Sequence, residues 1–406
     1  MPRPSLLPAA TLVAALAVPV AYGAAHDWPQ YRGPDRSGVG TATGLARSWP
    51  ATGPTVVWKR PIGAGFSSVA VVDGRVYVGA AEGEREFALC LEATTGKELW
   101  RADLGPRFPQ GDFGDGPRAT PTVADGKVYA VGGFGILHAL DAGSGKELWS
   151  VDLPKTYGAD VPRFGYSPSP LVDGGLVLAD AGGPEKSLVA LDAGTGELKW
   201  SIAAGPAGYS SPVAVTLGGV KQYLITRLRS AELISLAPDG KELWRHAAPP
   251  GMYTLPIAVP GDRLFLSTYD EFGGQLLKVT RQGDAFKVEE LWKNSRMRNQ
   301  YNTSVVVGET LYGFDNATLK AISLATGEQV WAFRGFGKGS LIAADGMLYV
   351  LSDLGVLALV KADPAAYQEI ARVQVLEGRT WTSPSIAGSR VFLRDHDEIV
   401  CVEVGS

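Results

Sequence analysis

The chain has 406 residues, a formal net charge of −4, 20% charged and 45% hydrophobic residues, and 51 glycines. This balance of charged and apolar residues is typical of a folded globular protein and excludes a largely disordered chain. The small net charge, with no long run of one sign, argues against a nucleic-acid partner held on a basic surface.

The first 25 residues have the pattern of a secretory signal peptide. Arg3 precedes an apolar run from about residue 6 to residue 20, and small residues follow at 21–25. A basic start, a short apolar run and small residues at a cleavage point are typical of such signals, and the run is too short for a membrane span. We expect export to the periplasm or secretion; an uncleaved anchor or an unstructured terminus is the alternative. Residues 26–54 are expected to form a leader segment ahead of the folded domain at 55–406.

A repeat of about 40 to 50 residues organises the rest of the chain. One copy, residues 139–149, reads ALDAGSGKELW, and similar segments end at Trp100, Trp200, Trp244 and Trp331. In four repeats, small and β-branched residues flank an Asp-Gly pair, which is a strong hairpin signal. These pairs stand at 73–74, 125–126, 173–174 and 345–346. No segment has sustained helical periodicity, so the sequence predicts four-stranded blades of an all-β propeller.

Eight segments can each begin the inner strand of a blade. They start near Ser67, Ala119, Ser167, Ser210, Thr254, Asn302, Gly339 and Thr382. The eighth blade lacks a fourth strand at the C-terminus, whereas residues 55–60 form a strand that has no blade of its own. We therefore expect an eight-bladed β-propeller in which the N-terminal strand completes the last blade, because closure removes open sheet edges. Seven blades plus a disordered tail is the alternative.

The two cysteines, Cys90 and Cys401, occupy the same place in their repeats and form no metal or CxxC pattern. They read as small buried apolar residues. A disulfide between the first and last blades is the alternative, since export permits it.

The pattern Ala-x-Asp-x-x-x-Gly-Lys-x-x-Trp, seen at 139–149, resembles the tryptophan-docking motif of the pyrroloquinoline-quinone (PQQ) type of propeller repeat. That family includes quinoprotein alcohol dehydrogenases and the propeller subunit of the bacterial machine that assembles outer-membrane proteins. The leader at 27–35, DWPQYRGPD, further resembles a group of exported bacterial PQQ-like repeat proteins. The resemblance implies the fold strongly and binding of PQQ only weakly, because one fold carries many functions.

Signatures of catalysis are scarce. Quinoprotein dehydrogenases of this fold carry an adjacent cysteine pair, a calcium ion beside the quinone and an aspartate base, and this chain has no adjacent cysteines and no dense carboxylate loop. His396, within Asp-His-Asp-Glu at 395–398, could belong to a metal site, but a solvated hairpin turn explains it as well. No metal or catalytic residue is assigned, and no cofactor is firmly implied; PQQ with calcium belongs to the oxidoreductase alternative.

Aligning the repeats reveals one position rich in aromatic and basic residues, immediately before the small pair that opens each inner strand. The residues are Phe66, Arg118, Tyr166, Tyr209, Tyr253, Tyr301, Lys338 and Trp381. A ring of this kind at the channel mouth could bind a planar, sugar-like or peptide ligand. Alternatively, each ring could wedge against the next blade. Long loops at 103–117, which contains Asp112 and Asp115, and at 152–163 are expected to roof the mouth.

These observations favour an exported binding or scaffolding propeller, with an unknown protein, small molecule or glycan as its ligand. We expect a monomer without a nucleic-acid partner. A quinoprotein-like oxidoreductase using PQQ is the alternative. No group in the ring is an activated nucleophile, so binding is favoured over turnover.

Overall fold

The computed structural model describes residues 26–406 apart from 229, 249–250, 253 and 270–271. The predicted signal peptide and Tyr253 lie outside these described residues. Within them, no helix has the length and hydropathy needed to cross a membrane.

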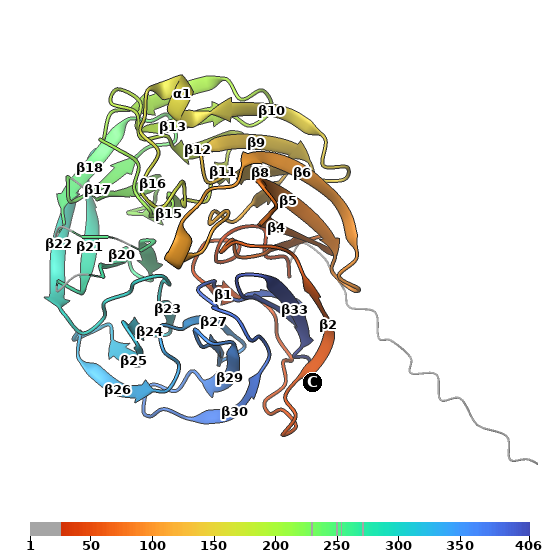
Figure 1. Cartoon of the computed structure of the whole chain (residues 1–406). Coiled ribbons are helices and arrows are strands. Elements are labelled where there is room, and N and C mark those ends of the chain that lie inside the picture. Colours follow the sequence, from red (N-terminus) through yellow and green to blue (C-terminus); the bar gives the residue numbers. More distant parts are fainter. Residues whose placement is uncertain (1–25, 229, 249–250, 253, 270–271) are drawn as a thin grey trace, which may run out of the picture.

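Eight antiparallel sheets of four strands form a ring around a central channel, as predicted (Figure 1). Blade 1 contains β3 (Ala70–Val72), β4 (Arg75–Glu82), β5 (Arg85–Glu92) and β6 (Glu98–Pro106). Blade 2 contains β7 (Thr122–Ala124), β8 (Lys127–Val131), β9 (Ile136–Asp141) and β10 (Glu147–Asp152). Blade 3 contains β11 (Leu171–Asp173), β12 (Leu176–Asp180), β13 (Leu188–Asp192) and β14 (Leu198–Ile202). Blade 4 contains β15 (Val213–Leu217), β16 (Val220–Arg227), β17 (Glu232–Leu236) and β18 (Glu242–Ala247).

The second half of the ring repeats this arrangement. Blade 5 contains β19 (Ile257–Val259), β20 (Arg263–Ser267), β21 (Gly274–Gln282) and β22 (Ala285–Asn294). Blade 6 contains β23 (Val305–Val307), β24 (Thr310–Asp315), β25 (Thr318–Ser323) and β26 (Gln329–Arg334). Blade 7 contains β27 (Ser340–Ala344), β28 (Met347–Leu351), β29 (Val356–Lys361) and β30 (Glu369–Gln374). Blade 8 contains β31 (Ser385–Ala387), β32 (Arg390–Arg394), β33 (Glu398–Glu403) and the N-terminal β2 (Thr55–Pro61).

The N-terminal strand closes the ring, which confirms the predicted closure. Strand β2 pairs antiparallel with β33, with Trp58 opposite Cys401. The Trp58 ring lies 6.1 Å from that of Phe392 in the same blade, and its Nε1 donates a hydrogen bond to the Ala93 carbonyl of blade 1 at 2.9 Å. Both cysteines are free and buried, and burial raises the pKa of Cys90 to about 11 and that of Cys401 to about 12.

The Asp-Gly hairpins form with one shift. Asp73, Asp125 and Asp345 all have φ of 49° and are followed by glycines of positive φ, as a tight hairpin turn requires. In blade 3 the sequence predicted a turn at Asp173-Gly174, but Asp173 still belongs to β11 and the two positive-φ residues are Gly174 and Gly175. The Gly-Gly pair takes the turn because neither glycine pays a steric cost at positive φ.

The repeated tryptophans join neighbouring blades. In five cases the ring lies where a Cβ on a glycine of the next blade would be: Trp58 at Gly96, Trp100 at Gly145, Trp149 at Gly196, Trp200 at Gly240 and Trp292 at Gly327. A Cβ at Gly145 would come within 2.6 Å of Trp100, so only glycine fits there. The Trp149 Nε1 also donates to the Ala193 carbonyl of blade 3 at 3.2 Å. The spacing of Gly and Trp in the repeat thus follows from contact between blades.

Two short helical segments interrupt the long loops, where no helix was expected. The 3-10 helix η1 (Gly111–Phe113) lies between blades 1 and 2, and α1 (Leu153–Tyr157) follows β10. Asp152 caps α1 because its side chain accepts the backbone N–H of Lys155 at 3.0 Å, and Gly158 ends it in a left-handed conformation. A single helical turn is too short to give a periodic signal in the sequence.

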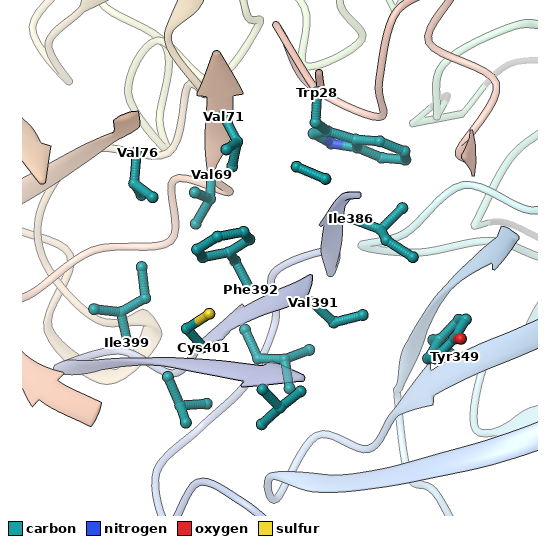
Figure 2. Packing of buried hydrophobic residues seen from close by; sticks show 14 of the residues in the cluster. Trp28, Val69, Val71, Val76, Tyr349, Ile386, Val391, Phe392, Ile399 and Cys401 are labelled. Carbon is teal, nitrogen blue, oxygen red and sulfur yellow. The ribbon is translucent and has the colours of Figure 1, made fainter. Parts of the chain in front are cut away.

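The leader lies inside the propeller. Strand β1 (Val39–Gly40) pairs parallel with the inner strand β27 of blade 7, so it adds a fifth strand at the centre of the ring (Figure 1). Trp28 bridges to Val71 of blade 1. Figure 2 shows the Trp28 indole in one cluster with Val71 of blade 1 and Ile386 of blade 8.

Candidate functional site

Two arginines of the leader cross the channel. The Arg36 guanidinium donates to the carbonyls of Ser169 and Pro170 of blade 3 and of Pro212 of blade 4, at 3.2, 2.6 and 2.7 Å. The Arg32 guanidinium donates to the carbonyls of Thr303 and Ser304 of blade 6, at 2.8 and 2.5 Å. The leader therefore contacts inner segments on several sides of the channel and acts as a plug.

The burial of these two arginines constrains which residues can stand elsewhere in the leader. Arg32 is fully buried and Arg36 is 1% exposed, and desolvation lowers their pKa to about 10 and about 9. Neither forms an ion pair with a described residue, so backbone carbonyls solvate both charges. A Cβ on Gly38 would come within 2.3 Å of the Arg32 guanidinium. Position 38 must therefore be glycine, because the Arg32 guanidinium occupies the space of any side chain there.

The small residues that precede the inner strands of neighbouring blades are linked by hydrogen bonds from blade to blade. The backbone N–H of Ser68 donates to Thr120 Oγ1 at 3.1 Å, that of Thr120 to Ser169 Oγ at 2.9 Å, and that of Ser169 to Ser211 Oγ at 2.9 Å. Ser383 N–H closes the step from blade 8 to blade 1 by donating to Ser68 Oγ at 3.1 Å. The small residues that open each blade therefore hold the mouth of the channel in a fixed shape.

A cavity of about 280 Å³ lies on these hydrogen-bonded residues, at the channel mouth. Five residues of the predicted ring line it: Phe66, Arg118, Tyr209, Tyr301 and Trp381. Three further aromatic residues line it too: Tyr31 from the plug, Phe113 from η1 and Phe164 from the loop before blade 3. Tyr31 belongs to the leader, so the plug forms part of the wall of this cavity, which we call the cup.

The aromatic rings of the cup contact one another across blades. Tyr301 and Trp381 stack with centroids 4.5 Å apart, and Phe66 stacks on Trp381 at 5.6 Å. Phe164 lies 5.4 Å from Phe113 and 5.7 Å from Tyr209. Such networks hold large apolar surfaces in one geometry at low cost in side-chain entropy.

Among the described residues of the cavity wall, Arg118 is the one charged side chain. It donates to the carbonyls of Gly116 and Gly114 at 3.1 and 2.9 Å and lies 5.7 Å from the centroid of Phe66. Burial lowers its pKa, while the charges of Glu86 and Asp115 act in the opposite direction. It stays a cation, because an arginine loses its proton only far above neutral pH.

The other predicted site residues lie elsewhere. Tyr166 is 2% exposed, donates its hydroxyl hydrogen to the Ala181 carbonyl at 2.8 Å and packs where a Cβ on Gly135 would be. Lys338 lies outside the wall, with its Nζ 5.5 Å from the centroid of Tyr301. Among the described ring residues, Tyr166 thus follows the alternative of a ring packed against protein. Phe66 is also largely buried, at 9% exposed, and lies where a Cβ on Gly114 would be.

The two acidic residues belong to the rim. Asp115 accepts the N–H groups of Gln110 and Gly111 and pairs with Arg107 at 3.1 Å, and the hydrogen bonds and Arg107 lower its pKa. Asp112 lies in η1, where its carbonyl accepts from Arg379 at 2.7 Å. Neither lines the cup, so both contribute through the η1 loop that bears Phe113.

The donors present do not fit a calcium-held quinone. The described residues of the cavity wall include no Asp, Glu or Cys, and no group of three His, Cys, Asp or Glu among the described residues could hold a metal ion. His396 instead bonds to Asp397 at 3.0 Å and lies 5.2 Å from Phe66. A flat cofactor stacking on Trp381 would have to displace Tyr301 or Arg379, since both lie 4.5 Å from that indole.

The fold and this cup define the class of protein: a binding or scaffolding propeller built from PQQ-like repeats. A family model described as "Outer membrane protein assembly factor BamB" matches residues 85–333, and the chain belongs to that family.

Similar proteins agree with this assignment. The chain is 26% identical over 383 residues to an outer membrane protein assembly factor BamB of Burkholderia pseudomallei, covering 87% of this chain and 89% of that protein. Among solved structures, BamB from Moraxella catarrhalis matches with a TM-score of 0.60 and 16% identity, covering 86% of this chain and 97% of that chain. Quinohemoprotein alcohol dehydrogenase from Comamonas testosteroni matches with a TM-score of 0.67 and 14% identity, covering 94% and 81%. These structural matches show a shared fold.

Proposed function

We propose that this chain is an exported scaffold that binds a partner protein of outer-membrane-protein assembly in the cup at its channel mouth. The cup itself carries the proposal: among the described residues, its wall contains Tyr31 of the leader, several aromatic rings of the blades and one cation, Arg118. Aromatic side chains and arginine are enriched among the residues that dominate protein interfaces. The similarity to BamB proteins supports a role in assembling outer-membrane proteins.

Site-specific cross-linking tests this function. A photoreactive phenylalanine analogue placed at Tyr209 or Tyr301 in the exported protein should form an adduct with a partner, because both positions line the cup. The matched control is the same analogue at Leu148, which is 45% exposed on the outer strand of blade 2. Adducts from Leu148 but none from either mouth position would place the binding surface elsewhere.

A variant that still folds provides a second test of the proposed function. Combining Arg118→Ala, Tyr209→Ala and Trp381→Ala should lower partner capture by at least about tenfold, since the loss of one well-packed interface residue costs on the order of 2 kcal/mol. Arg101→Ala with Leu148→Ala, on the outer surface, should leave capture unchanged. Circular dichroism and melting confirm that both proteins fold. Equal capture by the two variants would mean that the ring is structural.

Export is part of the same proposal, and it is supported by the basic and apolar pattern of residues 1–25. We expect the exported protein to begin near Ala24 and to be released without detergent. N-terminal sequencing of periplasmic or secreted material measures this directly. Recovery of residues 1–20 in a membrane fraction would contradict it.

A further inference from the structure

Two arginines outside the cavity wall add positive charge at the mouth of the propeller. Arg163 lies 5.2 Å from the centroid of Phe164, and Arg379 lies 4.5 Å from that of Trp381. With Arg118 on Phe66, three guanidinium groups thus lie on rings of the cup, from the entries to blades 2, 3 and 8. None forms an ion pair with a described residue. Guanidinium groups held by carbonyls and rings stay available to a carboxylate.

Two polar atoms in the wall also lack partners. Thr254 Oγ1 is buried and Gln300 Oε1 is buried, and neither forms a hydrogen bond among the described residues. Thr254 as a whole is 9% exposed. A buried polar atom without a partner costs on the order of 1–3 kcal/mol. Both atoms are shielded from solvent, so a peptide main chain would reach them only if the wall shifts on binding.

The shape of the cup narrows the ligand further. Its volume of about 280 Å³ is at the lower limit for a site that encloses a drug-sized molecule, so it suits one or two side chains. Tyr301 and Phe66 both stack on Trp381, and Arg379 lies 4.5 Å from its ring centroid, so this indole is already packed against three side chains. The remaining apolar surface fits an inserted side chain.

We infer that the cup receives an acidic peptide segment of the partner, with one aromatic or aliphatic side chain inserted among the rings and flanking carboxylates on Arg118, Arg163 and Arg379. This inference rests on the proposed function and specifies its ligand. The three arginines enter from different blades, so several carboxylates in an extended segment satisfy them better than a single anion does.

Synthetic peptides test the inference by isothermal titration calorimetry on the full exported chain. The probe is a capped pentapeptide with a central phenylalanine flanked on each side by one aspartate and one glutamate. Its controls replace the acids by asparagine and glutamine, the acids by lysine, or the phenylalanine by alanine. We expect the acidic peptide to bind at least about tenfold more tightly than each control, and to weaken with added salt.

Protein variants then show whether the charge of Arg118 or the fit of the peptide in the cup determines the preference. Arg118→Gln should reduce the preference for the acidic over the amide peptide severalfold. Arg118→Lys should retain part of the preference and covers the case in which Arg118→Gln does not fold. Arg101→Gln, on an exposed outer strand where Arg101 already pairs with Glu82 and Glu98, is the matched control and should change nothing.

Several outcomes would overturn the inference. These are no binding of the acidic peptide, equal binding of the amide or basic peptide, and a preference that survives Arg118→Gln. Stronger binding of heparin without any need for the phenylalanine would identify a polyanion surface instead. If cross-linking at Tyr209 captures a partner while acidic peptides fail, the proposed function stands and only this inference falls; if both fail, both fall.

Discussion

Deleting residues 50–60 should prevent this protein from accumulating as a stable monomer. The deletion removes β2 apart from its last residue and exposes the edge of β33, whose Val400 and Cys401 are buried in the closed ring. An exposed apolar edge strand pairs with other chains, so we expect aggregation and loss of the cooperative melting transition. Size-exclusion chromatography and calorimetry measure both effects.

Two point substitutions on β2 test the cause of this loss of stability. They show whether it comes from the contacts of β2 with its neighbours rather than from the shorter chain. Trp58→Ala should cost about 3–5 kcal/mol, because it removes a buried ring and the hydrogen bond to Ala93 that joins the last blade to the first. Val56→Thr should be nearly neutral, since Val56 is 50% exposed on the same strand. A deletion variant that melts at the wild-type temperature would disprove the closure mechanism.

The fold could be predicted from the sequence because each blade is specified locally. Asp-Gly turns define the hairpins, and the fixed distance from glycine to tryptophan reflects a contact with the next blade that recurs around the ring. The same register placed five aromatic or basic residues in the wall of one cavity. Residues at the same position of each repeat lie at equivalent places around the ring, so this part of the site could be predicted without a structure.

Other parts of the site could not be predicted in this way. Tyr166 occupies the repeat position of the ring, yet it turns into the space above Gly135, which depends on a residue more than thirty positions earlier. Phe113 and Phe164 lie in long loops outside the repeat, although the length of those loops was itself a signal. The leader has no periodicity, and Arg32 bonds to carbonyls 271 and 272 residues away.

The plug gives the second large prediction: Arg36→Ala should cost at least about 3 kcal/mol of stability. Arg36 is 1% exposed and satisfies three carbonyls of blades 3 and 4. Truncation leaves those carbonyls without this donor, at on the order of 1–3 kcal/mol each, and the loss of the desolvated charge offsets only part of that cost. Arg36→Met, which keeps most of the volume, should recover the packing but not the hydrogen bonds. Chemical denaturation measures the free energy of unfolding for each variant.

The matched control lies in the same leader. Arg47 pairs with Asp345 at 2.9 Å but its side chain is 59% exposed, so Arg47→Ala should cost less than about 1 kcal/mol. The plug also makes a prediction for binding, since Tyr31 of the leader lines the cup. Tyr31→Ala should therefore weaken partner capture at the mouth with little loss of stability, whereas Arg36→Ala should lower both. The buried arginines of the leader bond to carbonyls of blades 3, 4 and 6, so losing Arg36 should weaken the ring. An Arg36→Ala protein as stable as the Arg47→Ala protein would show that the leader only rests in the channel.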